Sequence, residues 1–314
     1  MSELSILDWL LSNSRVIDPK EIPSLEDWKY LFFDQATKWQ STIDMAISGS
    51  FISDRLAYAF AAGYWSALYC LIPSLPERTI TALCVTEKGG NHPKAIQTEL
   101  VPASGKDEPV WLLNGSKKFV TCANEADMLL IAASTGISPK GQNELRLVRV
   151  DNHTPGLLIK PIQDLPFIPE ISHGELEIYN IQIAESQILP GDGYTNYIKP
   201  FRTLEDLHVT SSVLGYLFRT ACLFNWPQSV KEQILAFLPG IKTISLSNPL
   251  QSTVHIVFGG ISSLFSSFIK SIEPHWRLTD DKTRSQWERD KALLNISGKA
   301  QSQRLSSAWA QYES

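Results

Sequence analysis

The chain lacks the features that define several large classes of protein. Its four cysteines, Cys70, Cys84, Cys122 and Cys222, show no Cys-x-x-Cys spacing. Neither a zinc site nor a disulfide framework is therefore indicated, and we expect no metal. No long cluster of lysine or arginine occurs and the net charge is −5, which argues against nucleic acid as the main partner. No internal repeat or low-complexity tract is apparent.

Signals for secretion and for membranes are also scarce. Residues 1–4 lack a basic region followed by an apolar segment, so we expect no secretory signal and a soluble, cytoplasmic protein. The longest uncharged segment, residues 249–269, is rich in serine and glycine and contains His255, which favours a buried helix over a membrane span. With 43% hydrophobic residues in 314, the chain can form two or three packed units.

The pattern of residue types divides the chain into three segments. Residues 1–78 are predicted to be helical, with a well-buried helix over residues 56–68. Residues 79–190 contain short β-rich runs separated by turn residues, which predicts an antiparallel β-sandwich or barrel. Residues 191–314 return to helical periodicity. The expected fold class is α+β, with an N-terminal helical domain, a middle β domain and a C-terminal helical bundle.

One helix expected in the last segment has an unusual second face. Residues 254–272 carry an apolar stripe at three- and four-residue steps, whereas their other face is glycine and serine without a single charge. We expect this small, neutral face to pack against another helix of a bundle. A contact between subunits is the alternative.

Two phrases in the middle segment carry the most information. Residues 84–90 read Cys-Val-Thr-Glu-Lys-Gly-Gly, and residues 114–121 read Asn-Gly-Ser-Lys-Lys-Phe-Val-Thr. Each is predicted to be a strand with hydroxyl and glycine residues near its end. Backbone amides, threonines and an aromatic side chain at two strand ends suit a flat aromatic ring with a polar rim. Alone, the second phrase is equally a β-hairpin with an Asn-Gly turn.

Together the two phrases resemble the halves of the flavin pocket in the acyl-CoA dehydrogenase family. The corresponding family sequences are Cys-Val-Thr-Glu-Pro-Gly-Ala-Gly-Ser-Asp and Asn-Gly-Thr-Lys-Trp-Ile-Thr-Asn. Residues 151–157 and 176–191 are similar to later elements of the family, in the same order, so the resemblance covers most of the chain from about Thr81 onward. The chain is shorter than typical members and has no Arg-x-x-Phe-Gly element, which binds cofactor across the subunit interface in the family.

The resemblance implies an FAD site in the middle segment. The first phrase would line the flavin ring from one side, with the Thr86 hydroxyl reaching its polar edge. Phe119 would replace the family's stacking tryptophan, and Thr121 would lie beside the reactive nitrogen of the flavin. The candidate cofactor-binding residues are Val85, Thr86, Phe119, Val120 and Thr121.

The resemblance also identifies what is missing from the catalytic machinery. Residues 289–304 match the flanks of the family segment that contains Tyr-Glu-Gly-Thr, but Ser297 stands where Tyr-Glu would be. A serine hydroxyl cannot replace the glutamate unless a partner lowers the cost of losing its proton. Relatives such as isovaleryl-CoA dehydrogenase place the glutamate in Leu-Glu-Arg-Leu, which resembles residues 204–207 and makes Glu205 the candidate base.

Each remaining candidate has a plain structural alternative. Glu205 and Asp206 could be acids at the N-terminus of a helix, and Asp206 in place of the family's arginine would raise the pKa of one of the two acids. His92 replaces the serine that binds acyl-CoA in the family, so it is a candidate substrate contact or an ordinary loop histidine. Arg202 could bind a phosphate or the Glu205 carboxylate, or form a surface ion pair worth little.

The resemblance implies an oxidoreductase of fatty acid metabolism. Such a flavoprotein would dehydrogenate a CoA thioester between its α and β carbons, with Glu205 as base and hydride transfer to FAD. Its expected partners are an acyl-CoA-like small molecule and further copies of the chain in a homo-oligomer, without nucleic acid or membrane. Two alternatives stay open: a degenerate member that binds a ligand or partner without catalysis, and a flavin-dependent monooxygenase, which needs no α-proton base.

Overall fold

The structure is a computed structural model that describes residues 5–103, 110–163 and 165–313. Its contacts divide the chain into two compact units. The helical unit consists of Met1–Pro73, Pro166–Glu170 and Arg202–Ser314, and the sheet unit of Ser74–Leu165 and Ile171–Phe201. The helices of the N-terminal and C-terminal sequence segments thus belong to one unit. Residues 1–4, on which the expectation about a secretory signal depends, lie outside the described residues.

The N-terminal part of the helical unit contains α1 (Ile6–Asn13), α2 (Leu25–Ala36), α3 (Thr42–Phe51) and α4 (Leu56–Leu71). The first three begin in the same way. Ser5, Ser24 and Ser41 each accept a hydrogen bond from the backbone amide three residues later, which satisfies a free donor of the first turn. All residues of α4 from Leu56 to Leu68 are buried, so the predicted buried helix is confirmed.

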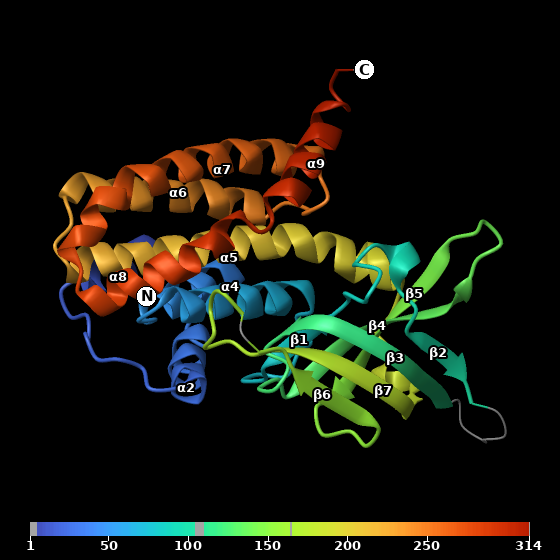
Figure 1. Ribbon diagram of the computed structural model, residues 1–314. Coiled ribbons are helices and arrows are strands. Elements are labelled where there is room, and N and C mark those ends of the chain that lie inside the picture. The colour runs from blue at the N-terminus through green and yellow to red at the C-terminus, as the bar shows by residue number, and fades with distance from the viewer. Residues whose placement is uncertain (1–4, 104–109, 164, 314) are drawn as a thin grey trace. The chain divides into compact units, whose positions relative to one another are not determined.

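The C-terminal part contains α5 (Lys199–Leu223), α6 (Gln228–Ser245), α7 (Ser252–Ile272), α8 (Asp281–Asp290) and α9 (Gly298–Trp309), with short helical turns η4 (Glu273–Leu278) and η5 (Lys291–Asn295). A π-helical turn, η3 (Tyr194–Ile198), leads directly into α5. In Figure 1, α6 and α7 run side by side. One apolar core joins helices from both ends of the chain, including Ile47, Leu214, Ile234, Phe258 and Trp287.

The expectation of a buried helix over residues 249–269 is met on one side only. The apolar stripe of α7 is buried at Val254, Phe258, Phe265, Phe268 and Ile272. Its small face is covered in part, where α9 places Leu305 so close to Gly259 that a Cβ there would lie 2.8 Å from a methyl group. Beyond that contact the small face is exposed at Gly260, Ser263, Ser266 and Ser267. Leu264 of the apolar stripe is also 64% exposed. By length and composition, Ser252–Leu278 could cross a membrane, and 22% of its most apolar stretch is buried.

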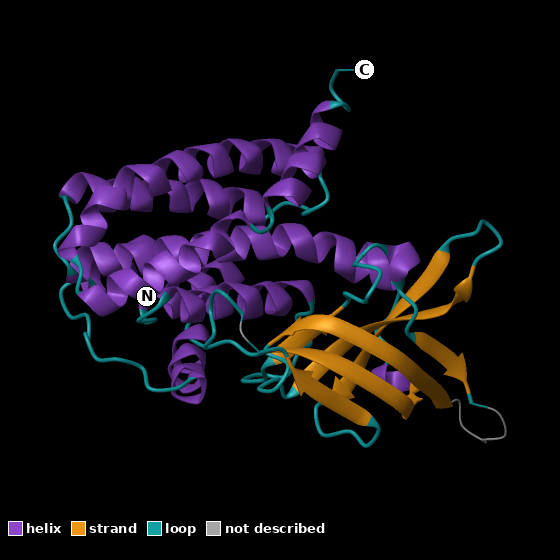
Figure 2. Cartoon of the chain, in the orientation of Figure 1, coloured by secondary structure: helices purple, strands orange, loops and turns teal. Residues whose placement is uncertain are grey.

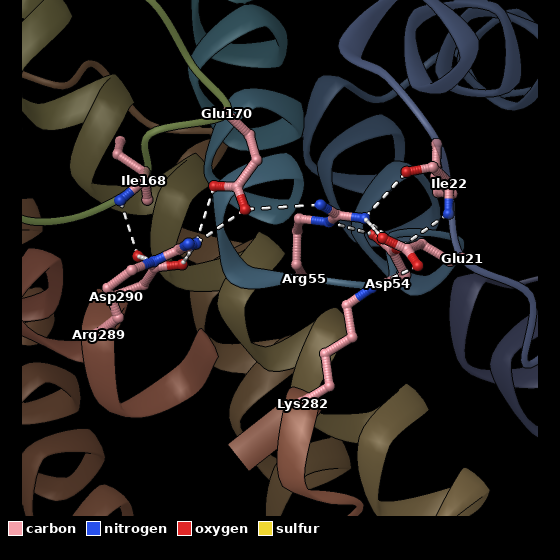
Figure 3. A network of polar contacts seen from close by, with 9 residues as sticks. All are labelled: Glu21, Ile22, Asp54, Arg55, Ile168, Glu170, Lys282, Arg289 and Asp290. Atoms are coloured by element: carbon pink, nitrogen blue, oxygen red, sulfur yellow. Dashed lines mark hydrogen bonds and ion pairs between the residues drawn. The ribbon is translucent and has the colours of Figure 1, made fainter. Parts of the chain in front are cut away.

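An ionic network holds three distant parts of the helical unit together (Figure 3). Glu170 accepts hydrogen bonds from Arg55 at 3.5 Å and from Arg289 at 2.9 Å. Asp290, whose side chain is fully buried, accepts from the backbone amide of Ile168 at 2.7 Å. The Arg-Asp pair that contributed to the family resemblance therefore anchors the segment Pro166–Glu170.

The sheet unit contains one curled sheet of seven strands (Figure 2). They are β1 (Thr81–Cys84), β2 (Glu99–Pro102), β3 (Val110–Thr121), β4 (Met128–Ile137), β5 (Asn143–Asp151), β6 (Leu157–Pro161) and β7 (His173–Ala184). The order is β1-β4-β2-β3-β7-β6, and β5 pairs with β4. Most pairs are antiparallel as expected, but β1 and β2 each pair with β4 in parallel. The predicted α+β fold class is confirmed.

Candidate functional site

The ends of β1 and β3 lie side by side in the sheet unit. The backbone amide of Lys118 donates a hydrogen bond of 2.7 Å to the carbonyl oxygen of Thr86, two residues after β1 ends. The two phrases singled out in the sequence, one containing Val85 and Thr86 and the other Phe119, Val120 and Thr121, therefore meet. The hairpin alternative for Asn114-Gly115 is wrong, because both residues lie inside β3 at a register shift against β7.

The backbone at Phe119 has an unfavourable conformation. Its φ is +54°, in a region where a bulky aromatic residue is a steric outlier, and Cys122 follows with φ +57°. The Lys118–Thr86 hydrogen bond fixes the chain on one side, and the amide of Cys122 donates to the carbonyl of Ser172 at 2.7 Å on the other. The Phe119 ring is 60% exposed. Such strain, held by its surroundings beside an exposed ring, is typical of binding sites.

A buried ion pair braces the two strand ends from within. Lys117 Nζ lies 2.5 Å from Glu87 Oε1, and the side chains are 0% and 6% exposed. Glu87 also accepts hydrogen bonds from the Gln97 amide and the Thr98 hydroxyl, both at 2.7 Å. Burial alone would raise the pKa of Glu87, but Lys117 and these donors outweigh burial and hold it below its ordinary value. The sequence did not predict this pair, although opposite charges in two matched phrases were the available signal.

A second unpredicted contact lies where β3 pairs with β7. His173 is the register partner of Thr121, and its Nε2 lies 3.4 Å from the Thr121 hydroxyl oxygen. The other ring nitrogen, Nδ1, lies 3.1 Å from the carbonyl oxygen of Ile171. Burial lowers the pKa of His173, although Ile171 and Glu125 oppose the shift. Nothing in the sequence near Thr121 pointed to this residue, because only the strand register brings the two together.

His92 has a local structural role. It is exposed and precedes the short helical turn η1 (Pro93–Ala95). Its Nδ1 accepts a hydrogen bond of 3.2 Å from the amide of Lys94. This geometry favours the ordinary loop histidine, and contact with a substrate stays a prediction.

The candidate base lies in the helical unit, on α5. Glu205 comes about three turns after the helical run begins at Tyr194, and the helix dipole acts only within the first turn. The helix-terminus interpretation of Glu205 is therefore wrong. Burial, and then the neighbouring charge of Asp206, raise the pKa of Glu205 to about 8. Arg304 and Arg202 oppose this shift, so Arg202 acts electrostatically on the candidate base.

The segment that lacks the usual glutamate packs against the same acids. Asp206 is buried and forms an ion pair with Arg304 of α9. Burial raises the pKa of Asp206, while Arg304 and hydrogen bonds from Gln301 and Ser297 oppose it. Gln301 in turn donates to the Ser297 hydroxyl at 2.8 Å. Both candidate locations for a base, α5 and the Ser297 segment, thus meet at Asp206.

A small cavity adjoins this cluster within the helical unit. It has a volume of about 130 Å³, and its lining includes Thr203, His255, Gln301, Ser302 and Arg304. Pockets for drug-sized ligands usually exceed about 300 Å³, so this cavity can hold a few atoms but no long acyl chain. In the part of the chain that the structure describes, no group of three or more histidine, cysteine or acidic side chains could hold a metal ion.

Comparisons with known proteins agree with this architecture. Residues 82–181 match the family model for the acyl-CoA dehydrogenase middle domain. Butyryl-CoA dehydrogenase from Megasphaera elsdenii is 15% identical, with a TM-score of 0.65 over 97% of this chain and 95% of that one. Glutaryl-CoA dehydrogenase from Mycobacterium smegmatis is 14% identical, with a TM-score of 0.67 over 98% and 94%. FMN-bound TdsC from Paenibacillus sp. A11-2 is 12% identical, with a TM-score of 0.68 over 99% and 98%. At these identities the likeness shows a shared fold.

Proposed function

We propose that this chain is a divergent member of the acyl-CoA dehydrogenase family, that it binds FAD and that it dehydrogenates a CoA thioester. The observation that carries the proposal is the meeting of Thr86 with the end of β3, fixed by the Lys118 amide. FMN in the TdsC structure supports a flavin as the ligand.

The residues at this edge fit a flavin ring. The exposed side chain of Phe119 offers an aromatic face. Thr121 offers a hydroxyl group two residues further along β3, and Thr86 offers another beside Lys118, whose amide binds the Thr86 carbonyl. The Glu87–Lys117 pair keeps these groups in place without presenting net charge to a ligand. Bound FAD would supply the acceptor for the hydride that leaves the β carbon of the thioester.

Glu205 carries the acid–base part of the proposal. In the ionised state, its carboxylate takes the α-proton while the β-hydrogen leaves with its electron pair as hydride, and a carbon–carbon double bond remains. A carboxyl group with a pKa of about 8 is a stronger base than an exposed glutamate, but it must first lose its own proton. We therefore expect turnover to rise with pH through about 8.

The decisive experiment begins with the visible spectrum of the purified protein, before and after addition of FAD. The proposal predicts a bound flavin that is bleached anaerobically by a member of a panel of acyl-CoAs. Glu205→Gln should abolish bleaching and leave the flavin bound. Glu232→Gln, the same change at an exposed position of α6, should leave both unchanged. A protein that binds no flavin refutes the cofactor, and bleaching that survives in Glu205→Gln refutes the base.

Binding without dehydrogenation is the second candidate, and two observations favour it. Ser297 replaces the usual glutamate, and Glu205 with a pKa of about 8 is largely protonated at pH 7. A yellow protein that no acyl-CoA bleaches, but whose chemically reduced flavin consumes oxygen to hydroxylate a substrate, would point instead to monooxygenation.

The proposal extends to assembly and location. We propose a homo-oligomer, because Val257 and Leu264 of α7 are 47% and 64% exposed beside its glycine and serine residues. Sedimentation of the purified chain tests this, and a monomer at micromolar concentration would contradict it. A cytoplasmic enzyme of fatty acid metabolism is the setting that such an activity implies.

A further inference from the structure

We propose that His173 fixes the direction of the Thr121 hydroxyl, so that this hydroxyl offers a bound ligand a hydrogen-bond acceptor and no donor. The inference starts from the two contacts of the imidazole ring. Nδ1 faces the carbonyl oxygen of Ile171 at 3.1 Å, and Nε2 faces the Thr121 oxygen at 3.4 Å.

The order of donors and acceptors follows from the chemistry of each group. A carbonyl oxygen only accepts, so Nδ1 of His173 must carry the proton that is shared with Ile171. In a neutral imidazole the other nitrogen then has a lone pair and no proton. The Thr121 hydroxyl must therefore donate to Nε2, which leaves only its lone pairs for a ligand.

The surrounding backbone holds both residues in this arrangement. Thr121 and His173 are direct partners in the antiparallel ladder of β3 and β7. Immediately after β3, the amide of Asn124 donates to the Ser172 hydroxyl at 3.2 Å, and that hydroxyl donates to the Glu125 carboxylate. These contacts fix the backbone at the end of β3 against the start of β7 and so keep Thr121 and His173 opposite each other.

The charges around the ring favour its neutral form. Burial is the largest influence on His173 and lowers its pKa, while the Ile171 carbonyl and the Glu125 carboxylate act in the opposite direction. Cys122 is buried beside the strand end, and burial raises the pKa of its thiol well above the ordinary value, so it adds no charge. Lys118 of β3 and Glu175 of β7 pair with each other at 2.8 Å. At low pH a second ring proton would reverse the Thr121 hydrogen bond.

The consequence for a cofactor depends on the proposed function. If Thr121 lies beside the reactive nitrogen of a flavin, an acceptor there matches the N–H of the reduced form. A donor would match the lone pair of the oxidised form. His173 is thus a positioning residue that favours the reduced cofactor through Thr121.

A second histidine–threonine pair provides an internal standard. His208 in α5 places Nδ1 2.7 Å from the Leu204 carbonyl and Nε2 2.9 Å from the Thr42 hydroxyl. The same logic makes it an Nδ1–H tautomer. His92 provides the opposite standard, because its Nδ1 accepts from the Lys94 amide and any proton of the neutral ring must sit on Nε2.

The first test uses the wild-type protein without cofactor. Long-range ¹H–¹⁵N correlation spectra near pH 7.5 report which ring nitrogen carries the proton. We expect His173 and His208 to show the Nδ1–H tautomer and His92 the Nε2–H tautomer. An Nε2–H tautomer at His173 overturns the proposal, because Thr121 would then accept from the ring and its proton would be free for a ligand. This test needs no variant and does not depend on flavin binding.

The second test measures the affinities for reduced and oxidised flavin, obtained as the midpoint potential of the bound cofactor. His173→Val should lower the ratio of the two affinities, reduced over oxidised, about three- to tenfold, the usual range for one hydrogen bond. The effect of His173→Val should persist when it is combined with Thr121→Ser and disappear when it is combined with Thr121→Val. An equal effect in all backgrounds overturns the role of Thr121. A protein that binds no flavin refutes the proposed function, while the tautomer test still decides the hydroxyl direction.

Discussion

The two units of the chain bury carboxylates with opposite results. In the sheet unit, Glu87 faces Lys117 and two further donors, and its pKa falls despite burial. In the helical unit, Glu205 lies next to a second acid, Asp206, and burial outweighs the arginines, so its pKa rises to about 8. A buried carboxylate with enough donors around it stays ionised and holds neighbouring strands in place. A buried carboxylate with too few donors has a raised pKa and is a candidate for acid–base chemistry.

The largest effect is expected where that compensation is removed from the sheet unit. Lys117→Met should lower the free energy of unfolding by about 3 kcal/mol, because it leaves the Glu87 carboxylate buried without its cation. Chemical denaturation at pH 7 measures the loss. Lys118→Met is the matched control, since the Lys118–Glu175 pair is 37% and 38% exposed and should cost at most about 0.5 kcal/mol. Equal losses of unfolding free energy at the two positions would show that the buried pair does not stabilise the two strand ends.

The second prediction concerns the acid pair of the helical unit. Glu205 holds its proton more tightly in the folded chain than in the unfolded chain, where its pKa is near 4.5. Its contribution to stability is therefore complete below pH 4.5 and is lost as pH rises through about 8. Glu205→Gln should remove this loss and raise the free energy of unfolding at pH 9 by about 1–2 kcal/mol.

Asp206→Asn provides the complementary measurement. It removes the like charge beside Glu205 and leaves Arg304 without its acid partner, and both changes lower the pKa of Glu205. The pH dependence of stability should shift downward accordingly. A profile that is unchanged in both variants would mean that Glu205 titrates near its ordinary value, and the comparison between the units would fail.

The sequence alone predicted most of the fold, because its cues are local. The buried helix over residues 56–68 follows from alanine and aromatic residues on every face, and the short runs of residues 79–190 gave the sheet. The parallel pairing of β1 with β4 was not predictable in this way, since no local pattern distinguishes it from an antiparallel neighbour. The expected packing of the small face of α7 against another helix is met only where α9 contacts Gly259, because a neutral face does not reveal how much of it is covered.

The candidate site shows the same difference between residues predictable from local motifs and residues joined only by the fold. Phe119 and Thr121 were predicted from a motif, and in the structure their strand contacts Thr86 through the Lys118 amide. His173 could not be predicted as a site residue, because 52 residues separate it from Thr121 and only strand register brings the two together. Side chains that act through a neighbouring residue leave little trace in a single sequence.

The smallest effect is expected at the strained position, and it should have opposite signs for stability and for binding. Phe119→Asn places a residue that tolerates positive φ where an aromatic does not, and the ring is 60% exposed, so little packing is lost. The unfolding free energy of the protein without cofactor should rise by about 0.5 kcal/mol. Flavin affinity, measured by fluorescence titration, should fall as the stacking face is removed. Tyr179→Asn removes another ring, 58% exposed, at a position without positive φ, and should give neither effect. If Phe119→Asn weakens both stability and binding, the left-handed backbone is not strained, and this edge of the sheet is a packed surface and not one shaped for a ligand.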